Sequence, residues 1–162
     1  MPEPAIALAA DHAGFELKNT LKAVLEARGL PVLDLDLAAP EAEDRLVAAI
    51  EEHGVDSIIH FAAKKQVGES VELPLHYYRQ NIGGLANVLA AVDRTGIDSL
   101  VFSSSAATYG MPDVALVPED LDCRPINPYG ETKLIGEWMI DNAITSARMR
   151  GTDFHAVKLR YF

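Results

Sequence analysis

The sequence predicts an α/β fold: a three-layer sandwich in which helices cover both faces of a five-stranded parallel sheet. Five short apolar runs alternate with segments whose apolar residues recur at helical spacing, which is typical of strand–helix–strand crossovers. Residues 57–62 form an apolar run with little alternation, as expected for a strand that is buried on both faces. Right-handed crossovers with one reversal near the first strand predict the order 2-1-3-4-5, a Rossmann-like or flavodoxin-like arrangement.

Local signals set the bounds that we expect for each element. Gly29 and Gly54 are helix stops, and Pro40 and Pro128 are suited to the first turn of a helix. We expect strands at residues 5–9, 31–37, 57–62, 100–105 and 154–162, and helices at 15–28, 40–53, 74–94 and 128–149. Residues 64–75 are expected to form a loop or a short helix. Residues 109–125 form a long connection, and such connections are often functional.

Composition limits the classes of protein that need to be considered. A chain of 162 residues fits a single domain with a substantial core. The net charge of −10 argues against a nucleic-acid partner, and no apolar run reaches the length of a membrane span. The single Cys123 excludes an internal disulfide and fits a reducing cytoplasm. The histidines show no metal-ligand spacing, so we expect no metal site.

Residues 101–133 carry the strongest functional signal. A strand ends in the run Ser103, Ser104, Ser105, and after the long connection a helix begins with Tyr129 four residues before Lys133. Residues at i and i+4 share a helix face, so the phenol and the ammonium point the same way. A cation beside a phenol favours the phenolate, which can act as a general base. The alternative is that the serines only end a strand and that Tyr129 is a packing residue.

Several segments together resemble the nucleotide-binding half of the UDP-glucose 4-epimerases, in the extended short-chain dehydrogenase superfamily. The resemblance covers residues 36–162. It rests on residues 58–71, 77–84, 102–106 with Tyr109 and Gly110, 127–130 with Lys133, and 159–162. It implies a bound NAD and hydride transfer assisted by a tyrosine base. It also implies that the family's smaller, sugar-nucleotide-binding domain is absent, so that epimerisation by this chain is slow or does not occur.

The resemblance assigns roles to individual residues. Tyr129 would be the base, Lys133 would contact the nicotinamide ribose, and Ser105 would bridge Tyr129 and the sugar oxygen. The cofactor would also be lined by the following residues: Phe61, Ala62, Lys65, Asn81 and Ser103. Asp34 and Asp36 could hold the adenosine ribose, as an acidic residue at the end of a second strand does, or could simply face solvent.

The first thirty-five residues carry a different resemblance. The epimerases have a glycine-rich loop after their first strand, whereas this chain has Gly14 alone, preceded by Asp11 and His12. The segment 11–18 resembles the start of the B-type ribose-5-phosphate isomerases, in which such an Asp-His pair lines the sugar-phosphate site. The interpretation is a chimera, natural or engineered, with an isomerase-like segment at 1–35 and an epimerase-like segment at 36–162. The alternative is a structural role without ligand binding, in which Asp11 caps a helix and His12 is partly exposed to solvent.

Three functional hypotheses remain open at this point. The chain is a half-epimerase that retains an NAD cleft, a folded chimera without activity, or a sugar-phosphate isomerase remnant that uses Asp11 and His12. The partners that fit are therefore a nucleotide or a sugar phosphate, and a homodimer stays open beside a monomer.

Overall fold

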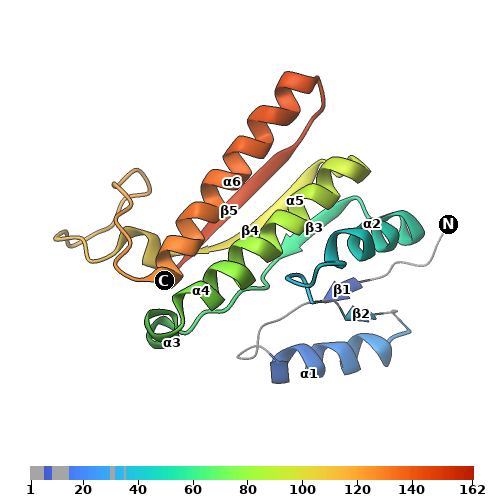
Figure 1. Ribbon diagram of the computed structural model, residues 1–162, viewed down its shortest axis with the longest axis horizontal. Helices are drawn as coiled ribbons and strands as arrows, with labels where there is room; N and C mark the ends of the chain where they lie inside the picture. The colour runs from blue at the N-terminus through green and yellow to red at the C-terminus, as the bar shows by residue number, and fades with distance from the viewer. Residues whose placement is uncertain (1–5, 9–14, 30–31, 35) are drawn as a thin grey trace.

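Two parallel sheets make up the β-structure of the computed structural model, which describes residues 6–8, 15–29, 32–34 and 36–162. The smaller sheet pairs β1 (Ile6–Leu8) with β2 (Val32–Asp34). The larger has the order β3-β4-β5, with β3 at Ser57–His60, β4 at Ser99–Ser105 and β5 at His155–Tyr161. Figure 1 shows the smaller sheet beyond β3, away from β5. All described ladders are parallel, as the alternation of strands and helices predicted.

The prediction of one continuous five-stranded sheet is only partly met. The neighbours 2-1 and 3-4-5 are found, but no ladder joins β1 to β3 within the described ranges. Both β1 and β2 are three residues long, and such a strand offers roughly one or two ladder hydrogen bonds to a neighbour. Of the apolar run at 31–37, the structure describes a strand at Val32–Asp34.

The helices follow the predicted positions, with one difference in the middle of the chain. Their bounds are α1 (Phe15–Glu26), α2 (Ala42–His53), α3 (Val67–Glu72), α4 (Pro74–Tyr77), α5 (Gly84–Thr95) and α6 (Pro128–Arg150). The single helix expected at 74–94 contains a π-helical segment, η2 (Tyr78–Gly83), between α4 and α5. A short 3₁₀ turn, η3 (Ala106–Tyr109), follows β4. None of the helices in the described ranges is long and apolar enough to cross a membrane.

The hydrophobic core lies between one face of the β3-β4-β5 sheet and the helices α2, α5 and α6. Leu100 and Phe102 of β4 point into it, and Val88 of α5 and Ile140 of α6 pack against them. Each large apolar side chain buried there contributes roughly 1.5–3 kcal/mol. Gly54 ends α2 in the left-handed conformation, with φ of 60°, as its position in the sequence predicted.

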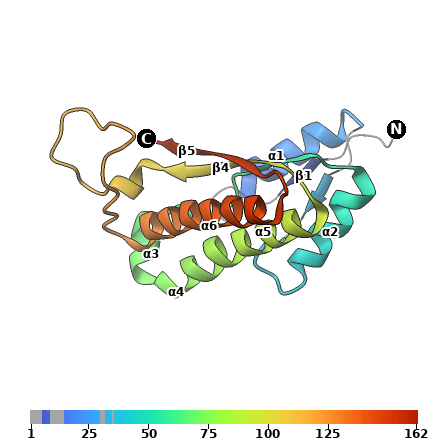
Figure 2. The same cartoon turned by 90° about the horizontal axis from the view of Figure 1, so that it is seen from above.

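The three-layer prediction fails over β4 and β5. In Figure 2 the helices α5 and α6 lie below these strands, whereas α1 is drawn on the upper side, beside β1. Among the described elements α1 packs against β2 instead. Helices that connect parallel strands in the same direction along a sheet lie on the same face, and α5 and α6 connect β3 to β4 and β4 to β5 in the same direction. Among the described residues, no helix therefore packs on the second face of β4 and β5.

The start of α6 is fixed by its own sequence. The Asn127 side chain accepts a hydrogen bond from the Gly130 N–H at 2.8 Å, and Pro128 occupies the first helical position. The helix therefore begins at the residue that the sequence indicated. Its first turn lies against η3, at the carboxyl ends of the strands, where α/β proteins usually bind ligands.

Candidate functional site

Lys133 is the residue that joins α6 to the end of β4. Its Nζ donates a hydrogen bond to the Ser103 carbonyl oxygen at 2.7 Å, and the side chain is buried. The same ammonium lies 5.1 Å from the ring centre of Phe102 and 5.9 Å from that of Tyr129. The expected i, i+4 proximity of Tyr129 and Lys133 is therefore present, with the cation held against the sheet.

The serine run at the end of β4 divides between the two faces of the sheet. Ser104 is buried and points towards α6, where its hydroxyl donates to Glu137. Ser103 and Ser105 are only partly buried and alternate with it. The Ser105 Oγ accepts from the Ala107 N–H at 3.2 Å and so caps η3. In the described part of the chain no hydrogen bond joins Ser105 to the Tyr129 hydroxyl.

Gly130 lets α6 approach the turn after β4 closely. A Cβ at this position would lie 2.6 Å from the Ala107 carbonyl oxygen and 3.1 Å from the Pro125 Cβ. Only hydrogen in place of a side chain is compatible with this distance. The backbone at the start of α6 therefore lies against the turn after β4.

Asn81, on the π-helical segment, binds protein groups with most of its amide. Its oxygen accepts from the Lys64 N–H at 2.7 Å, and its nitrogen donates to the Lys64 carbonyl at 3.0 Å and to Thr132 Oγ1 at 2.9 Å. Both N–H groups of the amide are thereby used, so a ligand could reach only the remaining lone pair of the oxygen. The residue ties the loop after β3 to α6.

Tyr78 lies on the same π-helical segment, and its hydroxyl donates to the Glu131 carboxylate of α6. This hydrogen bond raises the pKa of Tyr78 above its ordinary value, so this phenol is poorly suited to act as a base. π-helical segments are rare and are often found at functional sites. Here the segment aims two polar side chains, Tyr78 and Asn81, at the first two turns of α6.

The loop after β3 presents two exposed side chains at the carboxyl end of the sheet. Phe61 and Lys65 are exposed, whereas Ala62 is partly buried between them. The other predicted cofactor residues lie earlier in the chain. The Asp36 carboxylate accepts from the Ala38 N–H at 3.0 Å, and Asp34 ends β2 with a side chain outside the described residues. Asp11 and His12, the predicted substrate residues, also lie outside the described residues.

His60 is a buried histidine that sequence reasoning left unassigned. Its ring stacks on Phe102 with centroids 5.8 Å apart and planes at 12°. Burial, and then the nearby charge of Lys133, lowers the pKa of His60 from 6.5 to about 4. At neutral pH the ring of His60 is therefore uncharged. Groups of three metal-ligating side chains are absent from the described ranges, and His60 is not part of one.

A buried carboxylate, Glu137, organises the end of β5. Arg160 donates to both of its oxygens, at 2.9 and 2.7 Å, and also to the Tyr109 hydroxyl at 2.7 Å. Burial acts to raise the pKa of Glu137, but the hydrogen bonds from Arg160 and Ser104 outweigh it and hold that pKa below its ordinary value. Sequence reasoning missed this residue, although the spacing Tyr129, Lys133, Glu137 places all three on one face of α6.

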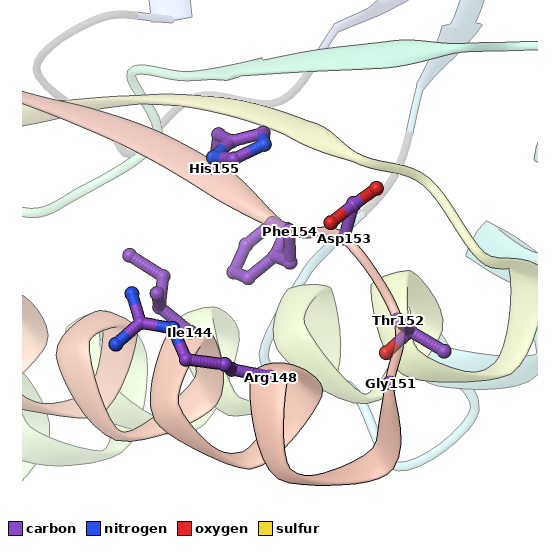
Figure 3. A pocket seen from close by; sticks show the side chains of 7 residues that line it. All are labelled: Ile144, Arg148, Gly151, Thr152, Asp153, Phe154 and His155. Carbon is purple, nitrogen blue, oxygen red and sulfur yellow. The ribbon is translucent and has the colours of Figure 1, made fainter.

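A shallow cavity of about 200 Å³ opens at the other end of α6. It lies at the turn between α6 and β5, beside Arg148, Asp153 and His155 (Figure 3). None of the side chains predicted to act on a ligand lines it. The strands begin at this end, whereas the hydroxyls of β4 and the first turn of α6 lie at the carboxyl ends. The cavity is therefore remote from the candidate site.

Comparison with known proteins places the whole described chain in one family. The NAD dependent epimerase/dehydratase family matches residues 6–162. The chain belongs to this family. Because the match begins at residue 6, one family accounts for the first strand and helix as well, and the comparisons give no support to an isomerase-like segment or to a chimera. The segment after β1, in which Gly14 is the one glycine, therefore lies within the family match.

Individual relatives agree with this assignment. The chain is 41% identical to the UDP-glucose 4-epimerase of Azospirillum brasilense over 133 residues, which cover 82% of this chain and 36% of the relative. It is 35% identical to the Bacillus subtilis enzyme over 151 residues, covering 93% and 42%. The chain therefore spans less than half the length of these curated relatives.

Solved structures of epimerases match the fold. The UDP-Glc/GlcNAc 4-epimerase of Campylobacter jejuni superposes with a TM-score of 0.82 at 30% identity, covering 99% of this chain and 46% of that chain. The UDP-glucose 4-epimerase of Brucella ovis in complex with NAD has a TM-score of 0.76 at 35% identity, covering 96% and 51%. These superpositions bear out the Rossmann-like α/β class that the sequence predicted.

Proposed function

We propose that this chain binds NAD across the carboxyl ends of β3 and β4, and that it corresponds to the NAD-binding half of a UDP-glucose 4-epimerase. One observation carries the proposal. Tyr129 and Lys133 share a face of α6, and Lys133 is hydrogen-bonded to the last residues of the central strand. A phenol and an ammonium that meet at this edge suit the nicotinamide ribose and the reacting sugar hydroxyl.

The residues around this pair fit a dinucleotide. Phe61 offers an exposed aromatic ring and Lys65 an exposed ammonium after β3, which suit a heteroaromatic base and a pyrophosphate respectively. The family is named for its dependence on NAD, and the Brucella ovis relative is in complex with NAD. The Bifidobacterium longum relative is in complex with NAD⁺ and UDP, which supports the wider proposal of a sugar nucleotide as substrate.

The side chains of this protein would transfer a proton, and they would not transfer a hydride. Bound NAD would supply the hydride acceptor. The Tyr129 hydroxyl would take the proton of the sugar hydroxyl, with the charge of Lys133 nearby to favour the anionic phenol. The Ser105 oxygen accepts from Ala107, so the hydrogen of its hydroxyl can still be donated to a sugar oxygen.

Turnover by a polypeptide of these 162 residues is expected to be very slow. Binding energy from the remote parts of a substrate positions the reacting carbon, and relatives that perform the reaction are more than twice as long. We therefore propose that these 162 residues bind NAD. We propose catalysis only where further polypeptide supplies the remaining contacts to the substrate.

Thermal unfolding in the presence of NAD tests the proposal. A ligand present at about 100 times its dissociation constant stabilises the folded state by about 2.7 kcal/mol, which is a clear rise in melting temperature. Tyr129→Phe should keep this rise, because the phenol acts on the substrate and not on the cofactor. Ribose 5-phosphate serves as the control ligand and should give no rise. No shift at about 1 mM NAD would contradict the proposal and leave a folded scaffold without a cofactor site.

A further inference from the structure

The irregular segment between η3 and α6 is long, and residues of the proposed function lie near both of its ends. We call residues 110–127 the connection; they form the longest segment without a helix or strand in the described part of the chain. Ser105 lies just before η3, and Tyr129 lies two residues after the connection. Figure 1 shows the connection at the carboxyl ends of β4 and β5. Its conformation therefore bears on the backbone that carries both residues.

Close backbone contacts hold the base of the connection. Gly110, its first residue, has a φ of 72°, and a Cβ there would collide with the Arg124 carbonyl oxygen. Its two ends therefore lie together. Packing adds little beyond this base, since Met111 is 83% exposed and Leu116 is 87% exposed. The middle of the connection therefore needs a polar contact if it is to keep one conformation.

Arg160 of β5 makes that contact. Its Nη1 donates to the Glu119 carbonyl oxygen at 3.2 Å and to the Tyr109 hydroxyl at 2.7 Å. The Tyr109 hydroxyl donates to the same carbonyl at 3.3 Å, and the guanidinium lies 4.7 Å from the centre of the Tyr109 ring. Among the described residues, no other hydrogen bond joins residues 111–123 to another element.

Arg160 is itself held from the other side by a buried carboxylate. Its Nε and Nη2 donate to the two oxygens of Glu137, at 2.9 and 2.7 Å, and Glu137 also accepts from the buried Ser104. Glu137 follows Lys133 by one turn of α6, and Ser104 precedes Ser105 on β4. The anchors of the guanidinium are therefore neighbours of the candidate site.

We propose that Arg160 is a positioning residue, which fastens the connection to α6 and β4 and so keeps the backbone at Ser105 and Tyr129 in place. The planar guanidinium can serve both carboxylate oxygens with one edge while its remaining nitrogen serves the hydroxyl and the carbonyl. A lysine ammonium is a compact point charge and cannot reach both sides at once. The effect on NAD rests on the proposed function, whereas the hold on the connection does not.

Arg160→Lys tests this role, because it keeps the charge that faces Glu137 and loses the bridge to Glu119. The rate of cleavage after Glu119 by a glutamate-specific protease, read by mass spectrometry, should rise by about fivefold or more, since cleavage follows the population of the open connection. Cleavage at glutamates in α2 should not rise with it. Hydrogen exchange of the amides of residues 111–123 should quicken in the same variant.

Two further variants complete the test. Tyr109→Phe removes the hydroxyl that accepts from Arg160 and donates to the Glu119 carbonyl, so it should also raise cleavage after Glu119, by about threefold. This variant keeps the test decisive if Arg160→Lys does not fold. Arg150→Lys is the matched control, because Arg150 pairs with Asp93 at the other end of α6. It should leave the cleavage unchanged.

NAD affinity tests the bearing on the site. If NAD binds only when the connection is closed, a variant that is closed one-tenth of the time shows an apparent dissociation constant about tenfold higher. We therefore expect a rise of about three- to tenfold in Arg160→Lys and none in Arg150→Lys. Titration calorimetry measures both.

Two outcomes would overturn the proposal. The first is a connection that is cleaved and exchanged at the same rate in Arg160→Lys and in the unsubstituted chain, or one whose faster cleavage is matched in α2, which would mean general destabilisation. The second is unchanged NAD affinity in an Arg160→Lys chain whose connection has opened. Absence of NAD binding in every protein, the unsubstituted chain included, would instead contradict the proposed function, and cleavage after Glu119 would then decide the role of Arg160.

Discussion

The Lys133 ammonium is hydrogen-bonded to the Ser103 carbonyl at 2.7 Å, which joins the second turn of α6 to the end of the central strand. The charge is buried, and it lies 5.1 Å from the ring centre of Phe102, 5.9 Å from that of Tyr129 and near the neutral ring of His60. The lysine therefore does two things: it holds α6 against the sheet, and it keeps a positive charge within reach of the tyrosine phenol.

Replacing this lysine should separate the two effects. In Lys133→Met the Ser103 carbonyl loses its charged donor, which we expect to lower the free energy of unfolding by about 1–3 kcal/mol. If NAD binds where we propose, its dissociation constant should also rise by about tenfold or more, because a charge-assisted contact is lost. Titration calorimetry with NAD and urea unfolding measure the two changes separately.

Lys158→Met is the matched control for this prediction. Lys158 is partly buried on β5 and pairs with Asp141, away from the turn after β4. The control should leave NAD affinity unchanged. Equal loss of affinity in both variants would mean that Lys133 acts only through stability.

The ion pair between Glu137 and Arg160 predicts a large loss of stability when it is broken. The Glu137 side chain is 4% exposed, and Glu137→Gln keeps its shape while removing the charge that faces Arg160. Breaking a buried pair on one side leaves an uncompensated charge, so we expect a loss of about 2–4 kcal/mol, reduced somewhat because Arg160 is partly exposed. Asp141→Asn breaks an exposed pair with Lys158 and should cost about 1 kcal/mol or less. Urea unfolding of the unsubstituted protein, Glu137→Gln and Asp141→Asn measures these losses. Equal losses of unfolding free energy in the two variants would contradict a special role for the buried pair.

Stability should fall as the pH is lowered from 7 to 5, and His60 should be the cause. The folded-state pKa of about 4 lies below the ordinary value of 6.5, so the unfolded chain binds a proton in this range while the folded chain does not. This costs about 2 kcal/mol at pH 5 and about 3 kcal/mol below pH 4, where the loss is complete. Glu137, whose pKa is lowered, adds its own loss only at more acidic pH.

His60→Leu removes this titration and should abolish most of the change between pH 7 and pH 5. His76→Leu is the control, because His76 is exposed on α4. Urea midpoints at the two pH values measure the difference. A pH dependence that survives in His60→Leu would show that another group titrates in this window.

Local signals sufficed to predict most elements. The bounds of α6 were predicted to within a residue, because Asn127 and Pro128 fix its start by their own chemistry. The π-helical segment could not be predicted in this way. It accompanies the hydrogen bonds from Tyr78 and Asn81 to α6, and their partners lie about fifty residues further along the chain.

The candidate site was predictable to the same extent. Tyr129 and Lys133 share a helix face by spacing alone, and Glu137 continues that spacing, so it could have been found. Its partner Arg160 is on another strand, and nothing local pairs the two. The face of β4 and β5 on which no described helix packs was also missed, because a run of apolar residues does not say whether a helix covers it. The isomerase resemblance rested on only eight residues, 11–18, and the comparisons give it no support.

Gly130 carries the last prediction, which concerns how closely α6 approaches the turn after β4. Gly130→Ala would bring a Cβ to 2.6 Å from the Ala107 carbonyl oxygen, which is backbone and cannot rotate away. The start of α6 must then shift, and we expect a loss of about 2–3 kcal/mol in the free energy of unfolding. Because Tyr129 is adjacent, the shift should also move the phenol away from the end of β4.

Gly68→Ala gives the matched comparison. Gly68 lies in α3 with nothing within 4 Å of the added carbon, so alanine there should be neutral or stabilising by about 0.5–1 kcal/mol. Urea unfolding of both variants tests the close approach, and NAD affinity of Gly130→Ala tests its bearing on the site. Similar stabilities for the two variants would mean that α6 and the turn are further apart than the structure places them, and the geometry proposed for Tyr129 would then be wrong as well.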